Sequence, residues 1–154
     1  MPNKPDPVCA ETGAWSATAG DVRGRLVRSG DRIELELENA SQQPHELRWD
    51  GTHLGFATFR LDDASGVEVP EPSWRYGGNE MVGSQSLQLP PGTTRVVIGD
   101  PIYGSMMGHR TIRIGAFWGR ELPDDGSPRF LRARVAADPA IDIPAVCVRA
   151  SLQL

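Results

Sequence analysis

Apolar and polar residues alternate along short stretches of this chain with the period of β-strands. The clearest stretch is Arg32–Glu38, where one isoleucine and two leucines alternate with charged residues. Strict alternation is typical of a strand with one buried face. Runs of strand character, separated by turn residues, predict ten strands: Val22–Arg28, Arg32–Glu38, His45–Trp49, Leu54–Leu61, Val67–Val69, Ser84–Leu89, Thr94–Ile98, Thr111–Phe117, Phe130–Val135 and Ala145–Leu154.

No window combines a helical repeat with helix caps, so the sequence predicts an all-β protein. Short strands at this spacing favour an antiparallel Greek-key β-sandwich of about 8–10 strands. We expect residues 1–12 to form a proline-rich leader and residues 13–154 to form a single sandwich domain. The 17 glycines and 13 prolines among 154 residues agree with this organisation, because they are spread along the chain as turns.

Charge and hydropathy exclude two kinds of partner. The chain has 16 basic and 20 acidic residues, with a formal net charge of −4. Nucleic-acid binding is therefore not expected, because it requires a basic surface. No apolar run is long enough to span a membrane, so no membrane span is expected either.

The two cysteines, Cys9 and Cys147, lie near opposite ends of the chain. In the last predicted strand Cys147 shares its face with Arg149 and other polar residues, which explains it poorly as core filling. We predict a Cys9–Cys147 disulfide and, because disulfides persist in oxidising compartments, a periplasmic or extracellular protein given as a mature chain without signal peptide. The alternative is a pair of unrelated free thiols in a cytosolic protein. By the same alternation, Arg132 and Arg134 are expected to face solvent.

Two stretches resist assignment as strands, Pro70–Met81 and Gly99–His109. Long loops on a rigid sandwich are where binding residues concentrate, and aromatic, arginine and methionine side chains are frequent binding hot spots. The candidate binding residues are Trp74, Arg75, Tyr76, Tyr103, Met106 and Met107. Alternatively, these aromatic side chains cap the open ends of the sandwich.

Three short motifs resemble the cupredoxin family. Gly30-Asp31 leads into a strand that ends at Asn39, a Pro44-His45 pair follows, and Leu89-Pro90-Pro91-Gly92 is similar to the family's turn before its metal loop. The resemblance implies a cupredoxin-like sandwich, with an immunoglobulin-like sandwich as the other possibility, and it makes His45 the first copper ligand. The sequence departs from the family because the loop that ends in Met106, Met107 and His109 lacks a cysteine. A site built from His45, His53, His109, Met106 and Met107 is the remaining possibility, since thioethers favour Cu(I).

Catalytic motifs are absent from the sequence, which has no Gly-x-Ser-x-Gly and no His-Glu-x-x-His. The pairs Asp62-Asp63 and Asp124-Asp125 are interpreted as turn residues. Asn39-Ala40-Ser41 fits a glycosylation sequon, and a turn-forming asparagine explains it equally well. We therefore expect a non-enzymatic binding domain for a protein or an extended ligand, without a cofactor, and as the alternative a copper-binding cupredoxin relative.

Overall fold

The structure is a computed structural model and describes residues 13–29, 32–52, 54–69, 74–75, 83–104, 110–114, 118–121 and 127–149. Eleven strands and no helix occur in this part of the chain. The strands are β1 (Val22–Ser29), β2 (Arg32–Asn39), β3 (His45–Gly51), β4 (Ala57–Asp62), β5 (Trp74–Arg75), β6 (Gly83–Leu89), β7 (Gly92–Gly104), β8 (Arg110–Ile114), β9 (Trp118–Glu121), β10 (Phe130–Ala137) and β11 (Ile141–Arg149).

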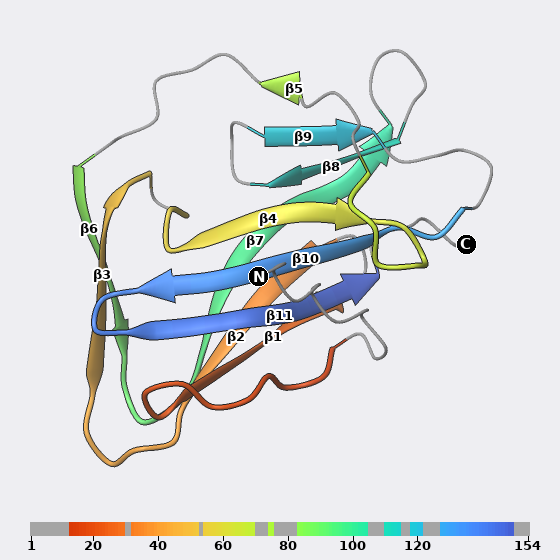
Figure 1. Cartoon of the computed structure of the whole chain (residues 1–154). Coiled ribbons are helices and arrows are strands. Elements are labelled where there is room, and N and C mark those ends of the chain that lie inside the picture. Colours follow the sequence, from red (N-terminus) through yellow and green to blue (C-terminus); the bar gives the residue numbers. More distant parts are fainter. Residues whose placement is uncertain are drawn as a thin grey trace, which may run out of the picture.

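The strands form three antiparallel sheets, and two of these face each other as a sandwich (Figure 1). The larger sheet has the order β1-β2-β7-β8-β9-β5, and the sheet opposite has the order β11-β10-β4. The strands β3 and β6 form a two-stranded ribbon at one end of the sandwich. β2 pairs with β7, and β4 pairs with β10, across long intervals of sequence, as Greek-key connections require. The predicted all-β antiparallel sandwich is confirmed.

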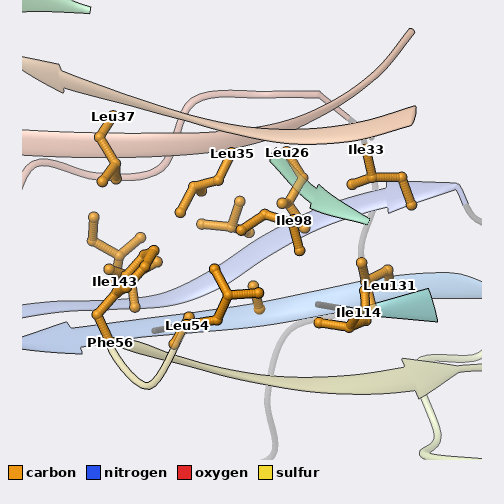
Figure 2. Close-up of a cluster of buried hydrophobic side chains, with 14 of the residues drawn as sticks. Leu26, Ile33, Leu35, Leu37, Leu54, Phe56, Ile98, Ile114, Leu131 and Ile143 are labelled. Atoms are coloured by element: carbon orange, nitrogen blue, oxygen red, sulfur yellow. The ribbon is translucent and has the colours of Figure 1, made fainter. Parts of the chain in front are cut away.

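One hydrophobic cluster fills the space between the sheets (Figure 2). Leu35 and Leu37 enter it from β2, and Leu131 and Ile143 enter it from β10 and β11. Phe56, in the turn before β4, is 2% exposed and completes the cluster. Burying one such side chain stabilises the fold by about 1.5–3 kcal/mol, so this cluster holds the two sheets together.

The segment Gly13–Ala19 closes the seam between the two sheets. Ala19 and Val22 exchange backbone hydrogen bonds of 2.8 and 3.0 Å across Gly20 and Asp21. Both of these turn residues have positive φ, 57° and 66°, which is the geometry of a tight two-residue hairpin turn. From that turn the segment runs back along β1, and at its start the Gly13 amide donates to the Cys147 carbonyl of β11 at 3.1 Å.

The predicted strands agree with the structure where the alternation is strong. They differ from it where a strand is defined only by pairing with another strand. Val67–Val69 is wrong as a strand, because it forms only an isolated bridge between Glu68 and Asp62. Thr94–Ile98 is the middle of the longer β7, and Thr111–Phe117 corresponds to the shorter β8. The alternation pattern did not predict β5 and β9, which are two and four residues long.

We expect Leu35→Ala to lower the free energy of unfolding by roughly 2–5 kcal/mol, because it leaves a cavity at the centre of the cluster. Val97→Ala is the matched control: Val97 lies on the neighbouring strand β7 and is 46% exposed, so its truncation should change stability by less than about 0.5 kcal/mol. Urea denaturation of both variants measures the difference. Equal losses would contradict the assignment of Leu35 to the core.

Candidate functional site

The predicted binding residues lie partly in strands and partly outside the described residues. Trp74 and Arg75 form β5, and Tyr103 lies near the end of β7, so the prediction that both stretches are loops is wrong at these positions. Tyr76, Met106 and Met107 lie outside the described residues. The strands arise because each stretch finds a backbone partner, which a local sequence pattern does not reveal.

The large sheet carries both predicted segments in one continuous ladder. β5 is its edge strand and pairs with β9, with Trp74 opposite Gly119 and Arg75 opposite Trp118. β9 pairs with β8, and β8 pairs with the end of β7, where Tyr103 lies opposite Thr111. Segments that are distant in sequence are thus connected through two intervening strands. Trp118 belongs to this part of the sheet and was not among the predicted binding residues.

Only one of the predicted copper ligands is described by the structure. His45 begins β3, is half-buried and lies opposite Leu89 of β6. His53, His109, Met106 and Met107 lie outside the described residues. Within the described ranges, no group of three or more His, Cys, Asp or Glu side chains is placed to hold a metal ion. One imidazole does not make a copper site, so the cupredoxin-type site stays a prediction.

Cys147 lies on the same face as Arg132 and away from the core cluster, as predicted, but this polar face is covered. Cys147 is 6% exposed and Arg132, opposite it, is 3% exposed, so the prediction that Arg132 faces solvent is wrong. The outer face of the three-stranded sheet is covered here, whereas Arg134, two residues along β10, is exposed as expected. No cysteine in the described part of the chain is a free thiol. Cys9 lies outside that part, and the Cys9–Cys147 pairing stays a prediction.

A buried ion pair occupies this covered face. Asp62 is fully buried, and its carboxylate accepts hydrogen bonds of 2.8 Å from the Nε atoms of Arg60 and Arg132. The interpretation of Asp62 as a turn residue is therefore wrong, because Asp62 ends β4. The interpretation holds for Asp63, whose Oδ1 accepts from the amides of Ser65 and Val67. Asp124 and Asp125 lie outside the described residues.

The neighbouring pair on the same sheet is exposed. Arg134 donates two hydrogen bonds to Asp142, Nε to Oδ1 at 3.0 Å and Nη2 to Oδ2 at 2.8 Å. These hydrogen bonds lower the pKa of Asp142 below its ordinary value of 3.8. Both side chains are more than half exposed, so solvent screens their interaction and little stability results.

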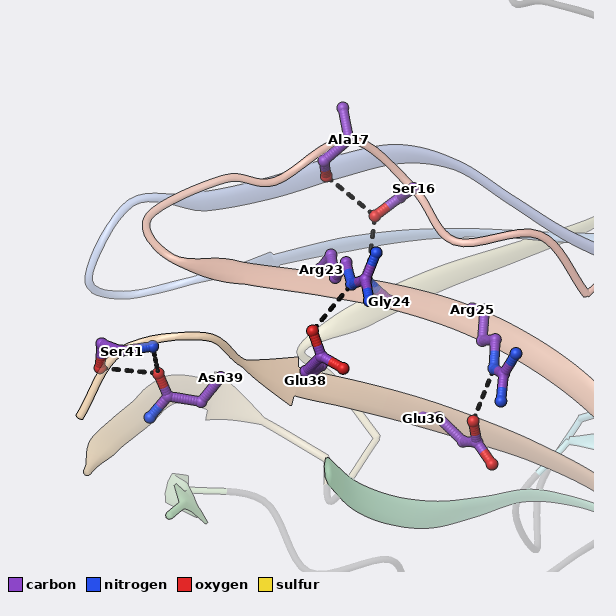
Figure 3. Close-up of polar contacts among 9 residues, drawn as sticks. All are labelled: Ser16, Ala17, Arg23, Gly24, Arg25, Glu36, Glu38, Asn39 and Ser41. Atoms are coloured by element: carbon purple, nitrogen blue, oxygen red, sulfur yellow. Dashed lines mark hydrogen bonds and ion pairs between the residues drawn. The ribbon is translucent and has the colours of Figure 1, made fainter. Parts of the chain in front are cut away.

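A polar network covers the outer face of β1 and β2 (Figure 3). Arg23 pairs with Glu38 at 2.9 Å, and Arg25 pairs with Glu36 at 2.6 Å. Trp15 lies against both guanidinium groups: its ring centroid is 4.5 Å from the Arg23 Cζ and 4.4 Å from the Arg25 Cζ. Sequence reasoning missed Trp15 because the contact depends on the Gly20–Asp21 turn, which brings the tryptophan over β1. The network fastens Gly13–Ala19 to the sheet.

Asn39 serves the fold. Its amide nitrogen donates to the carbonyl of Gln43 at 2.7 Å and to that of Leu89 at 3.0 Å, and its oxygen accepts from Ser41. The side chain is 2% exposed, and its nitrogen, the atom that a glycan would modify, is enclosed and bonded. Of the two interpretations of this sequon, the structural one fits.

A polar groove of about 510 Å³ lies over the ribbon of β3 and β6. Its walls come from both strands and from the turn between β10 and β11: Glu46, Arg48, Trp49, Asp50, Ser84, Gln85, Ser86 and Asp138. Three carboxylates face one guanidinium in this set, which makes the groove acidic. Its members come from three separate parts of the chain, so the sequence pattern did not indicate it.

Comparisons with known proteins give no information on function, so function is inferred from the geometry of the chain. No protein-family model, curated protein or solved structure matches the chain. Among the described residues, no helix has both the length and the hydropathy needed to cross a membrane. The surfaces that remain for a functional argument are the β5 end of the large sheet and the groove over β3 and β6.

We predict that Asp62→Asn lowers the free energy of unfolding by about 3–5 kcal/mol, since it removes the buried negative charge that faces Arg132. Asp142→Asn is the matched control on the same sheet and should cost less than about 1 kcal/mol. Chemical denaturation at neutral pH measures both. Equal midpoints for the two variants would contradict the difference in burial.

The lowered pKa of Asp142 predicts a pH dependence with a definite sign. The unfolded carboxyl group binds its proton at a higher pH than the folded one, so its contribution to stability is complete above about pH 5 and is lost as pH falls through the folded pKa. The difference in urea midpoint between the wild type and Asp142→Asn should therefore be small at neutral pH and vanish in acid. A difference that widens in acid would show the opposite linkage.

Proposed function

We propose that this chain is an exported, non-enzymatic binding domain that engages a protein or an extended ligand through the segments around Trp74–Tyr76 and Tyr103–Met107. One observation carries the proposal: the described parts of both segments belong to the same end of one sheet. A ligand at that end would meet both segments at once, although they are distant in sequence.

The position of β5 supports recognition of an extended partner. β5 is the edge strand of the large sheet, and an edge strand has one side whose backbone groups are not used within the sheet. Tryptophan and arginine in such a strand combine a large contact area with directional hydrogen bonds. The sandwich supplies the rigid support that binding segments need.

The state of Cys147 supports the export part of the proposal, because it is not a free thiol and disulfides persist in oxidising compartments. We propose that Cys147 pairs with Cys9, which would hold the leader against the sheet where Gly13 already bonds to the Cys147 carbonyl. Electrophoresis of the alkylated protein with and without reductant tests this pairing, and two alkylated thiols in the native protein would refute it.

The test of the binding surface is Trp74→Ala, with the wild type and the variant immobilised side by side against an extract of the native compartment. We expect a species that the wild type retains and the variant loses by at least tenfold, with no change in melting temperature. Equal retention by both proteins would refute the proposed role of Trp74.

Two further variants make this result interpretable. Val97→Ala lies on the same sheet, is exposed and should retain the bound species. Trp49→Ala shows the behaviour of a structural tryptophan, because the Trp49 ring contacts Phe56 at 4.9 Å and its Nε1 donates to the Thr52 carbonyl at 2.7 Å. If Trp74→Ala loses stability as Trp49→Ala does, Trp74 caps the sandwich and does not bind a partner.

A further inference from the structure

The outer edge of β6 is open, whereas described segments of the chain line the outer edges of β1 and β4. Gly13–Ala19 lines β1, where the Ser16 amide donates to the Gly24 carbonyl at 2.8 Å. β4 is lined by the segment after it, where the Val69 amide donates to the Leu61 carbonyl at 2.9 Å. β6 pairs with β3 on one side only. No comparable backbone partner lies along its other side among the residues that the structure describes.

The register shows which backbone groups point out of this edge. Arg48 of β3 exchanges both of its backbone hydrogen bonds with Asp138, at 2.8 and 3.0 Å, on the side away from β6. Ser86 lies directly opposite Arg48, so the two form a non-hydrogen-bonded pair of the antiparallel ladder. The amide and carbonyl of Ser86, and those of Ser84 two residues earlier, therefore point outward from β6.

The side chains of β6 do nothing to protect this edge. Natural edge strands are commonly guarded by lysine, proline, inward-pointing charges or a bulge. The sequence of β6, Gly-Ser-Gln-Ser-Leu-Gln-Leu, holds no charged residue and no proline, and its register with β3 contains no shift. An edge without charge, proline or bulge leaves its backbone groups unguarded against an added strand.

The groove beside the edge selects the charge of that strand. Glu46 and Asp50 both lean toward β6, because Gln88 donates to Glu46 at 2.8 Å and Ser84 contacts Asp50 at 3.4 Å. Arg48, between them in sequence, lies 3.7 Å from the Asp138 carboxylate on the opposite side. The short side chains of Ser84 and Ser86 leave room above this part of β6 for a longer side chain to reach Asp50, and a second long side chain reaches Glu46 alongside Gln88.

We propose that β6 binds an extended peptide as an additional strand, and that the peptide carries basic side chains at two positions four residues apart. Glu46 and Asp50 lie four residues apart on one face of β3, which is about 13 Å in a strand, and alternate residues of the added strand face the same way. The residue between the basic ones lies beside Ser86, in line with Arg48, and an acidic side chain there competes with Asp138 for the Arg48 guanidinium. Main-chain hydrogen bonds supply affinity, and the three alternate side chains supply specificity.

A synthetic seven-residue peptide tests this site directly. It is acetylated and amidated, with Lys at its second and sixth positions, Glu at its fourth and Thr or Val elsewhere. Titration followed by fluorescence anisotropy at low salt should give saturable binding. A peptide with Lys and Glu exchanged should bind at least tenfold more weakly, and equal binding of the two would overturn the charge selection.

Ser86→Pro tests the backbone part of the proposal. Proline removes the outward amide of Ser86 and leaves the ladder to β3 complete, so binding should fall at least tenfold while the melting temperature stays close to that of the wild type. Ser86→Ala keeps the amide and is the matched control, with binding retained. Unchanged binding by a folded Ser86→Pro protein would overturn the proposal.

A second measurement covers the case in which Ser86→Pro does not fold. In a strand, alternate residues direct their amides to opposite edges, so N-methylation of one set of alternate residues blocks one edge of the peptide and leaves the other intact. Methylation of the set that faces β6 should abolish binding to the wild type, and methylation of the other set should not. Equal effects of both sets would overturn strand addition. Concentration-dependent dimerisation that the peptide does not displace would also overturn it, because the edge would then belong to a second copy of the chain.

Discussion

The alternation of leucine and glutamate along β2 determines the register of the strands that pair with it on both sides. Ile33, Leu35 and Leu37 are fully buried in the core, while the glutamates between them face the other way. A slip of one residue in pairing would exchange these two sets and place three carboxylates between the sheets. β2 lies between β1 and β7, so its register determines theirs, and through them it determines where the N-terminal segment and the distant β8, β9 and β5 lie.

The outer face of β2 extends this constraint to the surface. Glu36 is 3% exposed although it belongs to the outer face, because Arg25 approaches it at 2.6 Å from β1 and Arg95 at 3.0 Å from β7. Arg25 in turn stacks on Trp15. The row from Trp15 to Arg95 connects the N-terminal segment with three strands, so the position of that segment and the register of the sheet support each other.

The limits of sequence reasoning follow from the range of the interactions. Alternation identified β1, β2 and β10, because one face of each meets the core. It did not identify β5, whose two residues form a strand only through pairing with β9. It placed Cys147 and Arg132 on the correct face but did not predict their burial, because periodicity separates the two faces of a strand and does not show that the second face is covered as well. The candidate surfaces depend on pairings across long intervals of sequence, and local patterns do not contain that information.

The β3–β6 ribbon shows how one constraint produces both stability and an exposed edge. Leu47 and Leu89 are fully buried on its inner face, and Asn39 donates to the Leu89 carbonyl at 3.0 Å, so the end of the ribbon near Leu89 is firmly held to the sandwich. From Leu87 back toward Gly83 the residues of β6 are glycine, serine and glutamine. This part of the strand lines the groove. A strand fixed at one end and open along one side presents its backbone in a rigid geometry. That arrangement lowers the entropy cost of adding a further strand.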